Sequence, residues 1–527
     1  MARNFHPEQT QSTLFAALLD AADQFGADKI ILEDAERTPL TFKKLILASL
    51  ILGAKVTRGT KRGETLGVLL PNSIGLTATL FGLNAFHRVG AILNFTAGKK
   101  QLVSALRTGR IRTILTSRRF IEMGNLEDLV TVLADLEWKQ GQKVRIVALE
   151  DVRTSIGTLD KINGALRAIV ARVLHRPSAT DPRAAAVVLF TSGTEGEPKG
   201  VVLTNANLLA NAYQMLDHMS TVLKADDVAF NPLPMFHSFG LTAGTLTPLL
   251  QGVKVTLYPS PLHFRQIPKF IRRNRATILF ATDTFLAGYQ RAAEAGDLAS
   301  LRYVIAGAER IKPQTRQLWT ANNTEILEGY GATECSPVVA VNQPNANRAG
   351  TVGRLLPGIS ARLEPVSGIS EGGRLFVRGP NVMAGYLLPE ESGVLVPPPG
   401  DWHDTGDIVT IDDDYLTIRG RAKRFAKIGG EMVSLAAIEG LAASLWDDAQ
   451  HVALSLPDPR KGEQIVLVTD KPDATKEAFQ LHARKEGFPE LWIPKAIHIV
   501  EAVPLLGSGK VDLAATQKLA LQAHALQ

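Results

Sequence analysis

Short apolar runs that alternate with helix-type patterns constrain this fold more than any other feature of the sequence. Between residues 29 and 305, most runs lead into polar or glycine-containing segments and then into apolar residues at helical spacing. The runs are Lys29–Leu32, Glu64–Leu70, Gly90–Asn94, Arg112–Thr116, Lys143–Ala148, Ala184–Phe190, Asp227–Asn231, Val253–Tyr258, Ala276–Phe280 and Leu301–Ile305. This alternation favours parallel sheets covered by helices, with ligands beyond the carboxyl ends of the strands.

The pattern changes after about Gly350, where strand-like runs are short and separated by Gly, Pro and Asp. A basic segment, Arg419–Lys427, then leads into mixed helices and strands. A chain of 527 residues is also too long for one ordinary domain. We therefore predict an α/β protein. Its large N-terminal domain, residues 1–420, would hold layered α/β subdomains and a β subdomain, and residues 421–527 would form a small α+β domain.

Composition excludes several classes of protein. Cys335 is the single cysteine, which rules out an internal disulfide and fits a reducing compartment. The N-terminus has no signal pattern, and no stretch reaches the roughly 20 apolar residues of a membrane span. We expect a cytoplasmic protein, with peripheral contact at the inner face of the membrane left open. The net charge of +6 comes without an aromatic-interleaved basic stripe, so no nucleic-acid binding is expected.

The segment Thr191–Gly200, TSGTEGEPKG, directly follows an apolar run. Its glycines let backbone N–H groups approach an anion, its hydroxyls can donate to phosphate oxygens, and Lys199 adds a mobile positive charge. The spacing is not that of a Walker A loop, and the chain has no GxGxxG. We predict a phosphate-binding loop rather than a plain surface turn, with the candidate residues Thr191, Ser192, Gly193, Thr194 and Lys199.

This segment resembles the signature loop of the adenylate-forming superfamily, which includes acyl-CoA synthetases, luciferases and peptide-synthetase adenylation domains. The resemblance covers nearly the whole chain. The stretches FHSFGLT, YPSPLH, GRAKRFAKIGGEMVS and PLLGSGK resemble the acyl–acyl-carrier-protein synthetase half of a bacterial bifunctional acyltransferase. Glu195 departs from the Thr or Ser of most members. A carboxylate there repels a triphosphate unless it points away or faces a metal.

The stretch GYGATE matches the second signature of the superfamily. The resemblance implies that Tyr330, between Gly329 and Gly331, stacks on adenine. It also implies that Thr333 meets the α-phosphate and that Glu334 holds Mg²⁺. A single carboxylate together with phosphate oxygens is a common Mg²⁺ ligand set. ATP and Mg²⁺ are therefore the expected cofactors, and an ordinary turn after a strand is the alternative for this stretch.

The resemblance extends to three further sites. Ala306-Gly-Ala-Glu309 is similar to the adenine-side loop, which makes Gly307, Ala308 and Glu309 candidates; Gly307 would also open the acyl pocket. Asp407 and Arg421 match the ribose contacts. His237 occupies a position between the acyl pocket and the thiol tunnel, where it would act as a gate. A strand-end turn and a partly buried histidine are the open alternatives for the first and last of these.

Two lysines carry the C-terminal part of the resemblance. Lys423 matches the hinge about which the small domain turns between half-reactions, although its basic neighbours Arg424 and Lys427 also fit a solvated strand edge. Lys510, in PLLGSGK, matches the catalytic lysine. Attack of a carboxylate on the α-phosphorus builds negative charge that a lysine can stabilise. Leu513 stands where the family often has arginine.

The implied reaction has two half-reactions: a fatty acid of medium or long chain becomes acyl-AMP, and a phosphopantetheine thiol then takes the acyl group. We expect acyl carrier protein as the acceptor and keep coenzyme A as the alternative. Arg272, Arg273 and Arg275 are candidate contacts for an acidic carrier, or else a solvated helix face.

Two other functions fit the sequence less well. A lysophospholipid acyltransferase needs His-x4-Asp, and none of the eleven histidines has Asp five residues on. That activity would have to come from a separate acyltransferase partner. A non-catalytic acyl- or nucleotide-binding protein would be expected to lose Lys510 or the Thr191–Gly200 loop, and both are present.

Overall fold

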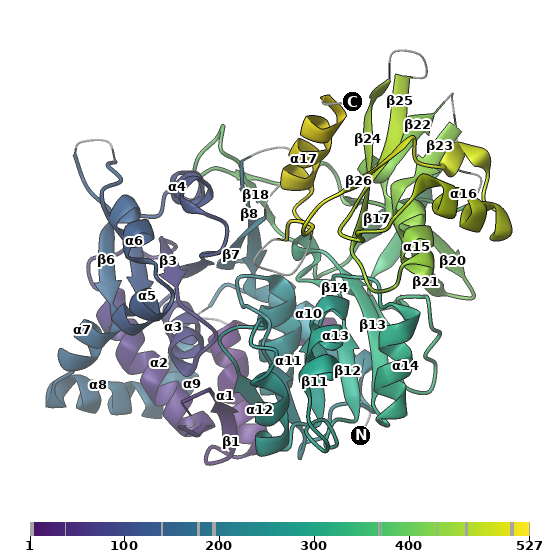
Figure 1. The fold of residues 1–527 in the computed structure, drawn as a ribbon. Coiled ribbons are helices and arrows are strands. Elements are labelled where there is room, and N and C mark those ends of the chain that lie inside the picture. Colours follow the sequence, from purple (N-terminus) through teal and green to yellow (C-terminus); the bar gives the residue numbers. More distant parts are fainter. Residues whose placement is uncertain are drawn as a thin grey trace. The chain divides into compact units, whose positions relative to one another are not determined.

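The computed structural model of this chain divides into two compact units (Figure 1). The first comprises Met1–Ile359 and Arg378–Asp401, and the second comprises Ser360–Val377 and Trp402–Gln527. The described residues are 5–36, 38–138, 141–176, 180–191, 197–366, 369, 371–428, 431–458, 462–505 and 511–525. The predicted α/β class, with a large N-terminal and a smaller C-terminal part, is confirmed. The boundary at residue 420 and the hinge near Lys423 stay predictions.

One sheet of the first unit has a parallel centre and antiparallel edges. Its order is β2 (Leu40–Thr41), β1 (Ile30–Glu33), β10 (Lys254–Leu257), β9 (Val228–Asn231), β11 (Ile278–Ala281), β12 (Tyr303–Ala306), β13 (Glu325–Gly331), β14 (Val338–Val341) and β15 (Arg354–Leu355). The strands from β1 to β13 are parallel, so the loops after β9, β12 and β13 meet at one edge.

The other sheet of this unit carries the predicted phosphate loop. Its order is β6 (Arg145–Ala148), β5 (Thr113–Thr116), β3 (Thr65–Leu69), β4 (Val89–Ile92), β7 (Ala185–Thr191), β8 (Lys199–Thr204), β18 (Gly385–Leu387) and β19 (Leu395–Val396). The strands from β6 to β7 are parallel, and those from β8 to β19 are antiparallel to their neighbours. This antiparallel edge, which sequence patterns did not predict, brings residues 385–387 beside β8, the strand that begins at Lys199.

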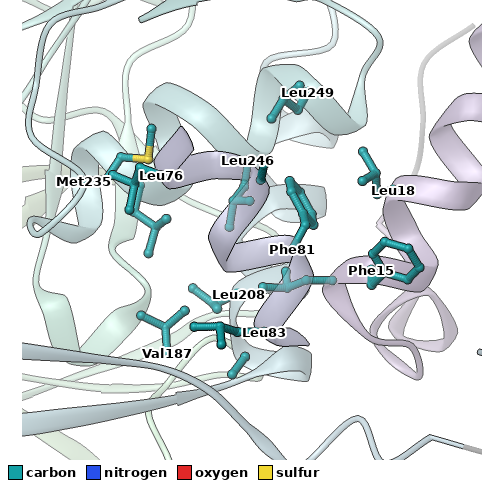
Figure 2. Packing of buried hydrophobic residues seen from close by; sticks show 14 of the residues in the cluster. Phe15, Leu18, Leu76, Phe81, Leu83, Val187, Leu208, Met235, Leu246 and Leu249 are labelled. Atoms are coloured by element: carbon teal, nitrogen blue, oxygen red, sulfur yellow. The ribbon is translucent and has the colours of Figure 1, made fainter. Parts of the chain in front are cut away.

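The core of this unit lies between the helices that cover the two sheets. Figure 2 shows Phe15 and Leu18 of α1 (Leu14–Phe25) near Phe81 of α3 (Ile74–Ala85), with Leu208 of α10 (Asn205–His218) in the same cluster. The side chains of Thr13, Ser73 and Thr204 cap these three helices by accepting a backbone N–H of the first turn.

The other α-helices described in this unit are α2 (Phe42–Val56), α4 (Lys99–Thr108), α5 (Arg118–Met123), α6 (Glu127–Ala134), α7 (Leu149–Thr154), α8 (Thr158–Ile169), α9 (Ala171–Leu174), α11 (Thr247–Leu250), α12 (Ile267–Asn274), α13 (Asp283–Ala292) and α14 (Pro313–Ala321).

A π-helix, η3 (Phe239–Leu246), follows β9 and lies next to the candidate site. The buried amide of Asn231, the last residue of β9, donates to the Gly240 carbonyl oxygen at 2.8 Å and contacts the Thr245 hydroxyl at 3.0 Å. A Cβ atom on Gly240 would lie 2.4 Å from the Leu233 carbonyl oxygen, so the close approach requires glycine. Single π-turns are common at functional sites, and here Asn231 ties the wide turn to the end of the strand.

The second unit contains two small sheets. The first is formed by β16 (Ser360–Glu364), β17 (Gly373–Arg378), β20 (His403–Asp412) and β21 (Tyr415–Arg421). The second is formed by β22 (Phe425–Ile428), β23 (Glu431–Ser434), β24 (His451–Asp458), β25 (Gly462–Thr469) and β26 (Ala496–Ile499), with the helices α15 (Leu435–Leu445), α16 (Lys476–Lys485) and α17 (Leu513–Ala525). Across the described part of both units, no helix has the length and apolar character needed to cross a bilayer.

Candidate nucleotide and acyl-adenylate site

The predicted phosphate loop connects two strands of a hairpin. Thr191 ends β7 and pairs directly with Lys199, which begins β8. The loop is therefore shorter than the ten residues expected, because the run from Lys199 to Thr204 continues as a strand. Ser192, Gly193, Thr194 and Glu195 lie outside the described residues. The hairpin holds the hydroxyl-bearing and the cationic end of the loop side by side.

Tyr386 connects this hairpin to the second signature. It lies on β18, where its backbone is opposite Val201 of β8. The Lys199 ammonium nitrogen lies 5.6 Å from the centre of the Tyr386 ring, and the Tyr386 hydroxyl donates to the Glu334 Oε1 at 2.9 Å. The loop lysine and the predicted metal carboxylate thus contact two ends of one tyrosine, although they come from distant parts of the sequence.

Residues 380–384 brace the segment that carries Thr333 and Glu334. Thr333 begins a short 3-10 helix, η4 (Thr333–Cys335), whose Cys335 carbonyl oxygen accepts from the Asn381 amide at 2.7 Å. The Met383 N–H donates to the Glu334 carbonyl oxygen at 2.8 Å. The Ser238 hydroxyl donates to the Thr333 hydroxyl at 3.3 Å. These bonds hold the backbone of both predicted phosphate and metal contacts in place.

Gly329, Tyr330 and Gly331 are the last three residues of β13, antiparallel to β14, with a bulge after Tyr330. These three residues extend the strand, and the second half of the GYGATE stretch, Ala332 to Glu334, lies in the turn that follows it, which was the open alternative. A Cβ atom on Gly331 would lie 2.2 Å from the Pro337 carbonyl oxygen, so no other residue fits there without a shift of backbone. The side chain of Tyr330 is half-buried, which leaves part of its ring accessible.

The loop after β12 contains Gly307, which has open space beside its Cα atom, and Glu309, whose carboxylate caps a helix. A Cβ atom on Gly307 would lie 3.4 Å from the Phe239 ring and 3.5 Å from the Gly329 carbonyl oxygen. Ala308 has a φ of 70°, the left-handed region. Glu309 accepts the Thr284 N–H at 2.9 Å in the first turn of α13. Burial raises the pKa of Glu309, and the hydrogen bonds from Thr284 oppose that rise. Its observed partner is therefore a helix terminus.

His237 lies one residue before Ser238 and two before the π-helix. Its backbone N–H donates to the Pro234 carbonyl oxygen at 3.1 Å, and its ring meets Phe236 edge-on with centroids 4.8 Å apart. The side chain is half-buried. This position puts His237 next to the Ser238–Thr333 contact, and its role as a gate stays a prediction.

In the second unit, Asp407 and Arg421 are directly opposite each other on β20 and β21. The Arg421 Nε lies 3.4 Å from the Asp407 Oδ1. Asp407 is 6% exposed, whereas the Arg421 side chain is 64% exposed. The carboxylate of the pair is therefore buried, and the guanidinium group is accessible to solvent. The antiparallel ladder therefore brings together the two residues predicted to contact ribose.

The segment predicted to be the hinge contains an ion pair to α15. Lys423 lies in the short helix η5 (Ala422–Arg424). Arg424 pairs with Glu439 of α15, whose carboxylate also accepts the Ala453 N–H at 2.9 Å. Burial raises the pKa of Glu439, and Arg424 opposes that rise. Arg424 is thus a half-buried ion-pair residue rather than part of a solvated strand edge. Lys510 lies outside the described residues, and Leu505 and Val511 on either side of it pair as an antiparallel bridge.

Sequence patterns did not reveal Tyr386, Ser238 or Asn381. Tyr386 belongs to a three-residue strand that is recognisable only by its pairing with β8. Ser238 was within a quoted stretch, FHSFGLT, but its hydroxyl becomes significant only beside Thr333. Asn381 follows a proline and reads as a loop residue. Only the tertiary structure reveals these three residues, because each one forms its hydrogen bond with a segment far away in the sequence.

The donor set fits Mg²⁺ bound together with a nucleotide. Among the described residues, no group of three or more His, Cys, Asp or Glu side chains could hold a metal ion by itself. Glu334 is half-buried, and its carboxylate is oriented by the Tyr386 hydroxyl. One protein carboxylate that works with phosphate oxygens and water is a usual environment for this ion. A dedicated protein cage is not needed.

The chain is similar over most of its length to known CoA synthases and ligases. The chain is 28% identical over 491 residues to a feruloyl-CoA synthase of Amycolatopsis sp, with 90% of this chain and 92% of the relative covered. It is 26% identical over 511 residues to a long-chain-fatty-acid–CoA ligase of Escherichia coli O157:H7, with 90% and 88% covered.

Solved structures show the same fold over nearly the whole chain. The anthranilate-CoA ligase AuaEII in complex with anthranoyl-AMP matches with a TM-score of 0.79 at 20% identity and covers 97% of this chain and 98% of its own. ATP-bound MatB from Rhodopseudomonas palustris matches with a TM-score of 0.77 at 22% identity, with 96% and 98% covered.

The fold is that of solved α/β enzymes, and within it Tyr386 contacts both Lys199 and Glu334. A family model described as "AMP-binding enzyme" matches residues 18–387, and the chain belongs to that family. It is an AMP-forming acid–thiol ligase that uses ATP to make an acyl-adenylate.

Replacing Tyr386 with phenylalanine tests the link between the hairpin and Glu334. Tyr386→Phe keeps the ring beside Lys199 but removes the hydrogen bond to Glu334, which releases the carboxylate. A hydrogen bond to a charged group contributes about 1.5–3 kcal/mol, so we expect the apparent KM for Mg-ATP to rise about tenfold with little change in Tm. Tyr303→Phe, at the amino end of β12, is the control. Unchanged nucleotide kinetics in Tyr386→Phe would contradict the role.

Proposed function

We propose that this enzyme activates a medium- or long-chain fatty acid as acyl-AMP with Mg-ATP and then transfers the acyl group to a phosphopantetheine thiol, preferably that of acyl carrier protein. The observation that carries the proposal is the convergence of Lys199, Tyr386, Glu334 and Thr333 at the mouth of the β7–β8 hairpin. The reaction would take place in the cytoplasm, at or near the inner face of the membrane.

In the first half-reaction, a carboxylate oxygen of the acid attacks the α-phosphorus, and the bond to the pyrophosphate oxygen breaks. No protein nucleophile is needed, so positioning and charge neutralisation account for the catalysis. The hairpin residues and Thr333 would hold the phosphates, and Lys510 would stabilise the charge that builds at the α-phosphorus. Glu334 would hold Mg²⁺, which when bound neutralises phosphate charge.

The resemblance to the adenylate-forming superfamily supports the roles of the residues that would hold the nucleoside. Tyr330 offers a partly accessible ring for adenine, with Gly307, Ala308 and Glu309 on the adenine side. Because Glu309 already accepts from the first turn of α13, we propose that this loop contributes backbone groups and that Glu309 orients it. Asp407 and Arg421 would bind the ribose hydroxyls, with Asp407 as the buried acceptor.

In the second half-reaction, the phosphopantetheine sulfur attacks the acyl carbonyl carbon and AMP leaves with the electrons of the anhydride bond. The small C-terminal domain would turn about Lys423 between the steps, and His237 would gate the thiol path. A carrier protein is supported by the resemblance of several sequence stretches and by the exposed basic end of α12, with Arg272, Arg273 and Arg275. Coenzyme A is the second candidate, because the relatives named above are CoA synthases and ligases.

The test supplies purified enzyme with Mg-ATP, a panel of fatty acids, and either holo acyl carrier protein or coenzyme A. We expect pyrophosphate release that depends on the acid and is lost when EDTA removes Mg²⁺. Thioester should form faster on the carrier protein. A lack of acid-dependent pyrophosphate would refute adenylation, whereas thioester formed with coenzyme A alone would overturn the choice of acceptor. Any acyltransferase that consumes the thioester would be a separate partner.

A larger side chain at Gly307 is expected to shorten the acids that the enzyme accepts. The space beside Gly307 is bounded by the Phe239 ring and the Gly329 carbonyl oxygen, and a leucine there would extend into it. Overpacking costs about 1–3 kcal/mol, so kcat/KM for palmitate should fall about tenfold or more while octanoate is less affected. Gly307→Ala is the matched control, because its Cβ would sit at ordinary contact distance. An equal loss for both acids would contradict this placement of the acyl chain.

A further inference from the structure

Helices α8 and α9 carry a stripe of large apolar side chains that points to solvent. Leu159 is 82% exposed, Ile162 51%, Leu166 58%, Ile169 78% and Val173 63%. In α8, the spacing of three or four residues puts Leu159, Ile162, Leu166 and Ile169 on one helical face, and Val173 follows on α9. A contiguous exposed apolar surface on a globular protein marks a contact with another molecule rather than ordinary surface composition.

The opposite face of the same helices is firmly attached to the first unit. A Cβ atom on Gly164 would lie 2.3 Å from Ile51 Cγ1 of α2, so the two helices approach closely. Lys55 pairs with Asp160 at 2.6 Å. The His175 ring packs edge-on against Phe15 with centroids 4.7 Å apart. The apolar stripe therefore faces away from the protein because the inner face is already packed, and Figure 1 shows α8 at the outer margin of this unit.

Basic side chains surround the stripe. The segment from Arg153 to Arg176 contains five basic residues and one carboxylate, Asp160, which pairs with Lys55. Arg172 pairs with Asp20 and Asp23 of α1, so the exposed cations that form the rim are Arg153, Lys161 and Arg176. Burial lowers the pKa of His175 to about 4, so this histidine adds no charge at neutral pH. An apolar face rimmed by lysine and arginine is the pattern of helices that lie in the interface of an anionic bilayer.

We propose that α8 and α9 dock this enzyme on the surface of an anionic lipid bilayer, with the Leu159–Val173 stripe buried among the acyl chains and the basic rim on the headgroups. A second copy of the chain fits less well, because an isologous contact would bring the same basic rims together. This docking rests on the proposed function and extends it. A bilayer holds fatty acids of long chain length, and an enzyme docked through α8 and α9 would take them from there.

The test measures binding of the full-length enzyme to vesicles without ATP or acid. Vesicles contain phosphatidylcholine alone or mixed with phosphatidylglycerol, and we expect tighter binding to the anionic ones. Leu159→Gln/Ile162→Gln/Leu166→Gln should weaken that binding by at least about tenfold, since glutamine keeps helix propensity but removes apolar area. Leu481→Gln is the control, because Leu481 is 74% exposed on α16 of the other unit.

A second variant tests the contribution of the basic rim separately from that of the apolar stripe. It changes only exposed charged residues, so the fold should be retained. Lys161→Gln/Arg176→Gln should weaken binding to anionic vesicles by roughly fivefold for each charge removed and leave binding to phosphatidylcholine unchanged. The proposal would be overturned if the wild-type enzyme did not bind anionic vesicles more tightly than neutral ones. It would also be overturned if the triple and double variants bound them as tightly as the wild type. A triple variant whose effect is confined to dissociation of a dimer in light scattering would overturn it too.

The outcomes also distinguish this proposal from the proposed activity. Pyrophosphate release with octanoate, which is soluble in water, should be the same in the triple variant and the wild type. If pyrophosphate release fails while vesicle binding follows the pattern above, the activity is wrong and the docking surface stands. If vesicle binding fails while pyrophosphate release persists, the docking surface alone is wrong.

Discussion

Lys510→Ala is expected to lower acid-dependent pyrophosphate release by at least about 10²-fold, the size of effect seen when one group that stabilises transition-state charge is removed. The attack on the α-phosphorus adds negative charge where two anions already meet, and only a cation in that position offsets it. Pyrophosphate release from Mg-ATP and octanoate measures this step directly.

The same variant should keep the second half-reaction. Thiol attack on a supplied acyl-AMP expels AMP and does not bring two anions together, so thioester formation should stay within a few fold of the wild type, an order-of-magnitude expectation. Lys518→Ala is the matched control, since Lys518 is an exposed lysine of α17 in the same unit. An equal loss of both half-reactions in Lys510→Ala would refute a role confined to adenylation.

Glu334→Gln is expected to give the other large effect. The amide keeps the size of the side chain and can still accept from the Tyr386 hydroxyl, but it loses the charge that would hold Mg²⁺. We expect kcat/KM for Mg-ATP to fall by about 10²-fold, because a misplaced cation no longer neutralises the phosphates in the transition state. A titration of MgCl₂ at constant ATP measures the effect.

The control for this variant is Glu391→Gln, which removes an exposed carboxylate of the same unit. Raising the Mg²⁺ concentration should partly restore the activity of Glu334→Gln, because weaker binding is compensated by mass action. An activity in Glu334→Gln that equals the wild type at every Mg²⁺ concentration would contradict the assignment. Together with Tyr386→Phe, this variant separates the charge of Glu334 from its orientation.

The strands that carry the site could be predicted because their apolar runs are local signals. The runs before Thr191, Asn231 and Gly307 all correspond to observed strands β7, β9 and β12. The boundaries moved by one or two residues, since a strand ends where its ladder partners end rather than where apolar character ends. The hairpin from Thr191 to Lys199 was missed, because an antiparallel return cannot be distinguished from a loop by composition alone.

The sequence by itself determined the chemistry that this protein can offer. A glycine- and hydroxyl-rich loop, the GYGATE stretch and the paired signals around Asp407 and Arg421 are short motifs whose residue types suit phosphate, metal and ribose. Their order along the chain identified the superfamily, and the family match confirms it. Such motifs can be read without a structure because each depends on a few neighbouring residues.

Only the tertiary structure decided how these groups are held. Tyr386 links Lys199 to Glu334 because β18 pairs with β8, and Ser238 reaches Thr333 because the π-helix follows β9. The same is true of α8. Its sequence does not show which of its sides is buried, and the structure packs the Gly164 side against Ile51. These contacts join residues far apart in the chain, and the free energy of such contacts depends on which surfaces the fold brings together rather than on local sequence.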